Sequence, residues 1–258
     1  MITLGMDIGS TTSKCVLLKD GVEIVAWALA PAGIGTDGPA QVYREVLLRG
    51  GVPEREIGRK MATGYSRKCW PPADGELSEL TAHALGCHLL LPSARTVIDI
   101  GGQDAKVVSL DAQGRMAGFV MNDKCAAGTG RFLDVMAGIL KRDVDELGGL
   151  AAQAAAPAAI SSTCTVFAES EVISQLANGV PVPDVVAGIC RSVAVRVAAL
   201  ARRAGVKEAV FMSGGVARNA GVRKALEDDL GVTLHTSELS QLAGALGAAI
   251  YGFQKMGQ

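Results

Sequence analysis

Two Asp-Ile-Gly segments carry residue types that bind phosphate. Asp7-Ile-Gly9 leads into Ser10, Thr11 and Thr12, and 92 positions later Asp99-Ile-Gly101 leads into Gly102, Gln103 and Asp104. Each segment ends an apolar run and passes directly into another one. Glycine lets the backbone approach an anion closely, and successive N–H groups in such a turn form an anion-binding nest. The sequence therefore predicts two phosphate-binding turns, and the three hydroxyl groups add donors to the first.

The carboxylates beside these turns suit a metal ion and a water molecule. Asp7 and Asp99 would repel phosphate directly, but they suit a hydrated Mg²⁺ held between carboxylate and phosphate. Gln103 and Asp104 are the candidates that would orient the attacking water, because phosphoryl transfer depends mostly on positioning and charge stabilisation. The residues do not decide which of these two side chains is the base.

A third glycine turn, Met212 to Asn219, joins an expected strand to an expected helix. Gly214 and Gly215, followed by Val216, leave room for a base and ribose against bare backbone. Asn219 suits either a helix cap or a contact with the nucleotide. The sequence contains no G-x-x-x-x-G-K-[S/T], so the chain is not a P-loop protein.

The elements that must position these turns alternate between strands and helices. We expect strands at 2–8, 14–18, 22–29, 60–63, 95–100, 104–110, 115–121, 208–212 and 232–235, and helices at 39–49, 76–91, 128–140, 166–178, 184–204, 217–229 and 239–254. This alternation favours α/β layers, and its repetition favours a duplicated unit. We expect one half to comprise 1–114 with the C-terminal helix 238–258, and the other 115–237.

Composition excludes several classes of protein. The formal net charge of −1 argues against nucleic-acid binding, which needs a concentrated basic face. No apolar stretch reaches the roughly 18 residues of a membrane span, and the N-terminus enters a strand-like run without a signal sequence. We expect a cytoplasmic protein with neither a membrane nor a nucleic acid as partner.

Six cysteines are present, and no two form a C-x-x-C pair. A disulfide framework does not suit a reducing compartment, and the spacing does not suit a zinc ribbon. Cys125 and Cys164 each precede an expected helix, whose N-terminus stabilises a thiolate. The residues alone leave open whether these two are buried structural thiols or metal ligands. The remaining four are expected to be core thiols (Cys15, Cys87 and Cys190) and a loop thiol without a role (Cys69).

The three glycine turns, in this order, resemble the two phosphate loops and the adenosine loop of the actin, sugar kinase and heat-shock ATPase superfamily. The resemblance spans nearly the whole chain. The segments Lys124–Asp134, Ser162–Val172 and Gly101–Asp104 resemble more narrowly the activators of 2-hydroxyacyl-CoA dehydratases, also called archerases, which belong to the BadF/BadG/BcrA/BcrD type. The resemblance implies duplicated actin-like (ribonuclease H-like) α/β halves with a nucleotide cleft between them.

The resemblance also implies an activity. Cys125 and Cys164 resemble the two cysteines that each subunit of a homodimer gives to one shared [4Fe-4S] cluster. Such proteins hydrolyse Mg-ATP while passing a low-potential electron, in anaerobic metabolism, from reduced ferredoxin or flavodoxin to a dehydratase or related reductase. Two alternatives stay open: a small-molecule kinase of the same superfamily, and a non-enzymatic actin-like ATP-binding module.

Overall fold

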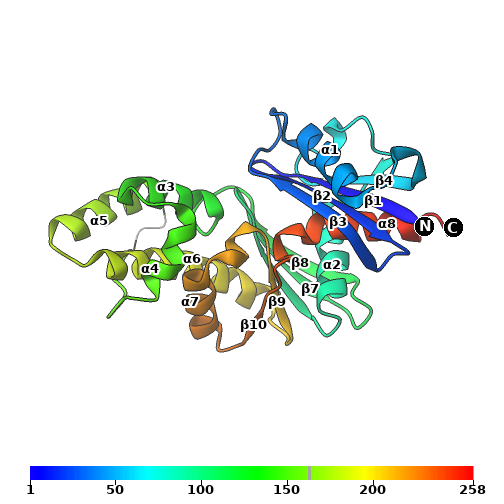
Figure 1. Ribbon diagram of the computed structural model, residues 1–258. Coiled ribbons are helices and arrows are strands. Elements are labelled where there is room, and N and C mark those ends of the chain that lie inside the picture. The colour runs from blue at the N-terminus through cyan, green and yellow to red at the C-terminus, as the bar shows by residue number, and fades with distance from the viewer. Residues whose placement is uncertain (162–163, 258) are drawn as a thin grey trace. The chain divides into compact units, whose positions relative to one another are not determined.

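The computed structural model describes residues 1–161 and 164–257. The structure contains helices and two five-stranded sheets (Figure 1). The strand orders of the sheets are β3-β2-β1-β4-β5 and β10-β9-β6-β7-β8. The chain divides into two compact units. The first comprises Met1–Val97, Leu110–Gly118 and Ser237–Gln258, and the second Ile98–Ser109 and Phe119–Thr236. Within the described residues, no helix is long and apolar enough to cross a membrane.

The first sheet is covered by helices on both faces. It contains β1 (Ile2–Ile8), β2 (Ser13–Lys19), β3 (Glu23–Ala30), β4 (Ile57–Thr63) and β5 (Gly75–Glu76), with β2 antiparallel to both β1 and β3, and β4 parallel to both β1 and β5. Its helices are α1 (Gly38–Gly50), α2 (Glu79–Leu90) and α8 (Ala243–Gln254). Cys15 and Leu17 of β2 pack with α1, whereas Val16 and Leu18 pack with α8. Because side chains alternate along a strand, the apolar run 15–18 of β2 is buried on both faces of the sheet.

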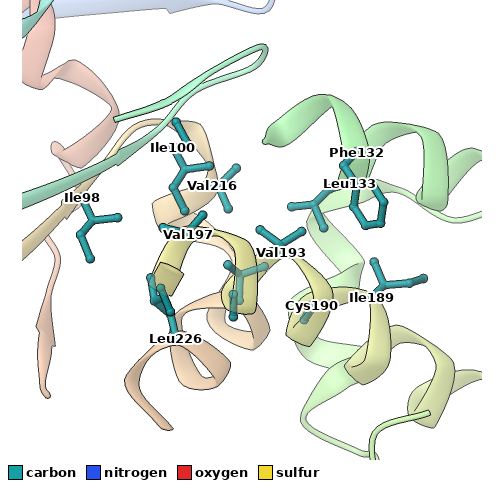
Figure 2. Packing of buried hydrophobic residues seen from close by; sticks show 14 of the residues in the cluster. Ile98, Ile100, Phe132, Leu133, Ile189, Cys190, Val193, Val197, Val216 and Leu226 are labelled. Atoms are coloured by element: carbon teal, nitrogen blue, oxygen red, sulfur yellow. The ribbon is translucent and has the colours of Figure 1, made fainter. Parts of the chain in front are cut away.

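The remaining elements surround the second core. The strands are β6 (Thr96–Ile100), β7 (Ala105–Leu110), β8 (Met116–Asn122), β9 (Val210–Ser213) and β10 (Leu234–His235), and the helices are α3 (Gly130–Leu140), α4 (Leu147–Ala151), α5 (Thr165–Ala177), α6 (Val182–Ala204) and α7 (Ala220–Leu230). Figure 2 shows Val193 and Val197 of α6 packed among apolar side chains of neighbouring elements. The 3.6-residue apolar period of α6 thus places this 23-residue helix in the core.

Three helices begin three or four residues later than the sequence predicts. The helix expected from residue 76 begins at Glu79, because Gly75–Glu76 pair with β4 and Ser78 caps the helix by accepting the N–H of Thr81 at 3.1 Å. The helices expected from 217 and 239 each begin as a short 3₁₀ turn before α7 and α8. The five-residue helix α4 was not expected.

Candidate functional site

The first glycine turn closes between β1 and β2. The N–H of Gly9 donates to the carbonyl of Thr12 at 3.0 Å. Asp7, at the end of β1, is only 3% exposed. Lys14 lies directly opposite Asp7 in the strand register, and its Nζ is 3.1 Å from Asp7 Oδ2. The turn therefore begins at a buried carboxylate whose charge is balanced by an ammonium group.

The second turn repeats this arrangement between β6 and β7. The N–H of Gly101 donates to the carbonyl of Asp104 at 2.9 Å. Asp99 is 2% exposed, accepts a hydrogen bond from Ser213 Oγ at 2.8 Å and lies 3.5 Å from Lys106 Nζ. Lys106 follows Asp99 by seven residues, as Lys14 follows Asp7. The sequence analysis did not identify either lysine, although the shared spacing was a usable signal.

A glycine after the neighbouring strand approaches each buried carboxylate. Gly64 follows β4 with φ of 95°, and a Cβ there would lie 2.5 Å from Asp7 Oδ1. Gly214 follows β9 with φ of 84°, and a Cβ there would lie 3.0 Å from Asp99 Oδ1. Only glycine adopts this backbone readily and leaves this space. Gly64 is the first unit's counterpart of Gly214, and the sequence analysis missed it.

These turns have the chemistry that Mg-nucleotide requires. Gly9, Ser10, Thr12, Gly101 and Gly102 are half-buried, and the two side chains at the turn tips, Thr11 and Gln103, are exposed. Among residues 1–161 and 164–257, no group of three or more His, Cys, Asp or Glu side chains suits a metal ion. Mg²⁺ is usually held by one or two carboxylates together with phosphates and waters, so the carboxylates of Asp7 and Asp99 in their glycine cradles still fit it.

The third turn lies at the start of α7. Gly214 and Val216 are buried, and Gly215 is exposed. Asn219 caps α7, because its Oδ1 accepts the N–H of Val222 at 3.0 Å. Gly215 is exposed and has no side chain, so its backbone leaves room for the flat base of a nucleotide.

Cys125 and Cys164 are both exposed, which excludes the alternative that they are buried structural thiols. Cys125 lies in the loop 123–129, where Asn122 Nδ2 donates to the carbonyl groups of Cys125 at 3.0 Å and Ala127 at 3.2 Å. Cys164 is the N-cap residue of α5, and its carbonyl accepts the N–H of Ala168 at 2.9 Å. Ser162 and Thr163, which begin the motif around Cys164, lie outside the described residues.

The other cysteines lie where the sequence predicts. Cys15, Cys87 and Cys190 are buried, and Cys69 is exposed. Burial raises the pKa of the Cys190 thiol to about 12, and it raises the pKa of Cys15 still further. Buried thiols with such raised pKa values are poor metal ligands, because the thiolate is the ligating form. The exposed thiols of Cys125, in the loop before α3, and of Cys164, at the N-cap of α5, have the donor chemistry and access that an iron-sulfur cluster needs.

The loop that carries Cys125 is attached to the second glycine turn. The N–H groups of Gly130 and Arg131, the first residues of α3, donate to the carbonyl groups of Gly101 and Gly102, each at 2.8 Å. A Cβ at Gly130 would also lie 3.6 Å from Val216 Cγ2. One helix N-terminus therefore contacts both turns of the second unit, five residues after Cys125.

The chain is similar over nearly its whole length to several known proteins. The chain is 55% identical over 254 residues to the (R)-2-hydroxyglutaryl-CoA dehydratase activating ATPase of Acidaminococcus fermentans, covering 98% of this chain and 97% of that protein. It is 49% identical over 254 residues to the activator of lactoyl-CoA dehydratase of Anaerotignum propionicum, covering 98% of both. The solved activator of 2-hydroxyisocaproyl-CoA dehydratase from Clostridium difficile, with bound ADPNP, matches with a TM-score of 0.96 and 50% identity, covering 99% of this chain and 95% of that one.

A more distant likeness concerns the fold alone. A ROK hexokinase from Thermus thermophilus matches with a TM-score of 0.56 at 17% identity, covering 99% of this chain and 100% of that one. This likeness confirms the sugar-kinase type of α/β fold that the sequence predicts. Residues 4–252 match the family model, and the resemblance seen in the sequence motifs is confirmed. The chain belongs to the BadF/BadG/BcrA/BcrD ATPase family.

Proposed function

We propose that this chain hydrolyses ATP and passes a low-potential electron from an iron-sulfur cluster to a 2-hydroxyacyl-CoA dehydratase or a related reductase. The observation that carries the proposal is the attachment of α3 to the Gly101-Gly102 turn, because α3 directly follows the loop of the exposed Cys125. Membership of an ATPase family sets aside the kinase and the non-enzymatic module. The names of the two curated relatives support a dehydratase as the partner.

In this proposal the glycine turns divide the nucleotide among them. The β- and γ-phosphates contact Gly9, Ser10, Thr11, Thr12, Gly101, Gly102 and Gln103, and adenosine contacts Gly214, Gly215, Val216 and Asn219. Asp7 and Asp99 are the residues that would hold Mg²⁺, which would supply positive charge against the phosphates. Gln103 and Asp104 orient the attacking water.

Cys125 and Cys164 supply the cluster in this proposal. A cubane cluster takes four thiolates, and each chain offers the exposed thiols of Cys125, in the loop before α3, and of Cys164, at the N-cap of α5. A two-fold axis through the cluster completes the set, so the protein is an isologous homodimer. Reduced ferredoxin or flavodoxin is the electron donor, and the cytoplasm of an anaerobic cell suits both the donor and an exposed cluster.

ATP acts on the cluster through α3. When the γ-phosphate is gained or lost at the Gly101-Gly102 turn, the two hydrogen bonds from Gly130 and Arg131 pass the displacement to the start of α3 and to the loop 123–129. A one-electron potential change of about 59 mV corresponds to about 1.4 kcal/mol. A shift of 100–200 mV would thus need only about 2–5 kcal/mol of interaction that differs between the two nucleotide states.

The test is iron and sulfide analysis with size measurement under strict anoxia. The unmutated protein should be a dimer holding about four irons per two chains. Cys125→Ser removes two of the four ligands at once, because symmetry repeats the change, so the cluster should be lost while ADPNP binding persists. Cys69→Ser is the matched control, since Cys69 is also exposed but lies on no expected ligand position. Four irons per single chain, or a Cys125→Ser dimer that keeps its cluster, would refute the bridging arrangement.

A further inference from the structure

The two phosphate turns have the same backbone but different charges. In the first turn, Lys14 faces Asp7, and the turn ends in the uncharged Thr12. In the second turn, Asp104 stands at the position of Thr12, so Lys106 faces two carboxylates. The first group is formally neutral, whereas the second carries one excess negative charge. A neutral turn suits an incoming phosphate, and an excess carboxylate suits a water molecule that must lose a proton.

Lys106 is closer to Asp104 than to Asp99. Its Nζ lies 2.8 Å from Asp104 Oδ2 and 3.5 Å from Asp99 Oδ2. The Lys106 side chain is 3% exposed, while that of Asp104 is 25% exposed. The ammonium group is thus fixed inside the unit, and the carboxylate that it binds reaches solvent. A hydrogen-bonded ion pair at 2.8 Å with one buried partner holds geometry more firmly than an exposed pair.

The second oxygen of Asp104 is directed over the turn. A Cβ built on Gly101 would lie 2.9 Å from Asp104 Oδ1, so this oxygen occupies space that only glycine leaves. Oδ2 is held by Lys106, and Oδ1 lies against the backbone proposed to bind phosphate. This arrangement leaves Oδ1 as the oxygen that can accept a hydrogen bond from water at the phosphate.

We propose that Lys106 is a positioning residue that orients Asp104, and thereby the attacking water, over the second turn. The inference rests on the proposed ATP hydrolysis. In that step the water oxygen bonds to the γ-phosphorus, and the bond from that phosphorus to the β–γ bridging oxygen breaks. ADP leaves with the electron pair of that bond, and a water proton passes to Asp104 Oδ1 and then to solvent. In the described part of the chain Lys14 pairs with Asp7, and the position equivalent to Asp104 is the uncharged Thr12, so Lys14 has no such role.

A double-mutant cycle separates this role from a merely structural one. Asp104→Asn should lower kcat for ATP hydrolysis about 100-fold, because it removes the acceptor of the water proton. Lys106→Met should cause a similar loss. The kcat of the double variant should be at most about threefold below that of the less active single variant, because both changes disrupt the same Lys106–Asp104 pair. Lys106→Arg keeps the charge but moves it, so an intermediate loss is expected. Lys224→Met, which breaks an exposed ion pair with Asp228, is the control and should leave kcat unchanged.

Thermal unfolding without nucleotide gives a second readout. Lys106→Met leaves two carboxylates without their cation and should lower Tm, and adding Asp104→Asn should restore part of the loss because it removes one of these charges. If Lys106→Met does not fold, the cycle is run with Lys106→Arg. The inference is wrong if the unmutated protein hydrolyses ATP but the two losses of kcat multiply in the double variant. It is also wrong if the double variant has a lower Tm than Lys106→Met. An unmutated protein that neither binds nor hydrolyses ATP would overturn the proposed function, and this inference with it.

Discussion

The contact between α3 and the second turn can be perturbed by one methyl group. A Cβ at Gly130 would lie 3.1 Å from the carbonyl oxygen of Gly101 and 3.4 Å from Gly102 Cα. Gly130→Ala therefore forces α3 and the turn apart by a few tenths of an ångström. The change lengthens the two 2.8 Å hydrogen bonds through which the proposed signal passes.

The free-energy cost of Gly130→Ala is the difference between two opposing contributions. Overpacking at a tight contact costs about 1–3 kcal/mol, whereas replacing glycine by alanine in a helix gains about 0.5–1 kcal/mol. The net cost, about 0–2.5 kcal/mol, falls on the arrangement that binds nucleotide. The middle of this range, about 0.7–1.4 kcal/mol, predicts that the Kd for ADPNP rises about threefold to tenfold, since 1.4 kcal/mol is tenfold. Dehydratase activation per ATP hydrolysed should fall further, because the shift also separates the turn from the Cys125 loop.

Gly138→Ala provides the matched control. Gly138 lies on the same helix, is exposed, and a Cβ there would meet nothing within 4 Å. This variant should gain stability with no change in ADPNP affinity or in activation. The measurements are calorimetric Kd values, Tm, and the ratio of dehydratase turnover to ATP hydrolysed. If Gly130→Ala behaves like Gly138→Ala in affinity and in that ratio, the proposed route through α3 is wrong.

Two further predictions concern the separation of the sites and the thiols. Gln103→Ala, like Asp104→Asn, should reduce ATP hydrolysis strongly and leave iron content near that of the unmutated protein, since neither side chain is a thiol ligand; a parallel loss of iron would show that the sites are not distinct. Alkylation at pH 8 followed by mass spectrometry should label Cys69, Cys125 and Cys164 in protein without a cluster, and Cys69 alone when the cluster is bound. Cys190 should stay unlabelled in both, because a pKa of about 12 leaves about one thiol in ten thousand ionised at that pH; labelling of Cys190 before unfolding would contradict its burial.

The sequence predicted long periodic elements well and short ones poorly. The helix expected at 184–204 is α6, Val182–Ala204, because its apolar period extends over many turns. The five-residue α4, which contains Gly148 and Gly149, has neither length nor propensity to mark it. The two-residue β5 exists through its pairing with β4, which no local pattern records.

The candidate site, like the fold, is predicted from the sequence only in part. The turns at Gly9 and Gly101 could be recognised because their chemistry lies within a few consecutive residues. For the lysines the sequence offers only the shared seven-residue spacing from each aspartate, and the strand register is what shows that Lys14 lies opposite Asp7. The approach of Gly64 to Asp7 likewise depends on the parallel pairing of β1 with β4. The link from α3 to Gly101 joins segments 29 residues apart and follows from tertiary packing alone.

The loop that carries Cys125 has a counterpart in the first unit. There the N–H of Ile34 donates to the carbonyl of Gly9 at 3.2 Å, as the N–H of Gly130 donates to that of Gly101 at 2.8 Å. In each loop a threonine hydroxyl donates to the carbonyl group three residues earlier, at 2.6 Å for Thr36 and 2.7 Å for Thr129.

Both loops precede a helix that begins with glycine, at Gly38 and Gly130, again 92 residues apart. Each unit thus ties the segment before its helix to its own glycine turn, through Ile34 within the first loop and through Gly130 at the helix start in the second, and neither hydrogen bond involves the thiol. At the 92-residue spacing of the two helix starts Gly33 corresponds to Cys125, whereas at the 93-residue spacing of the two threonines it corresponds to Ala126. In the proposed function Cys125 is a cluster ligand, and the segment that follows it is hydrogen-bonded to a glycine turn, so a change of nucleotide state at that turn would reach the ligand through this segment.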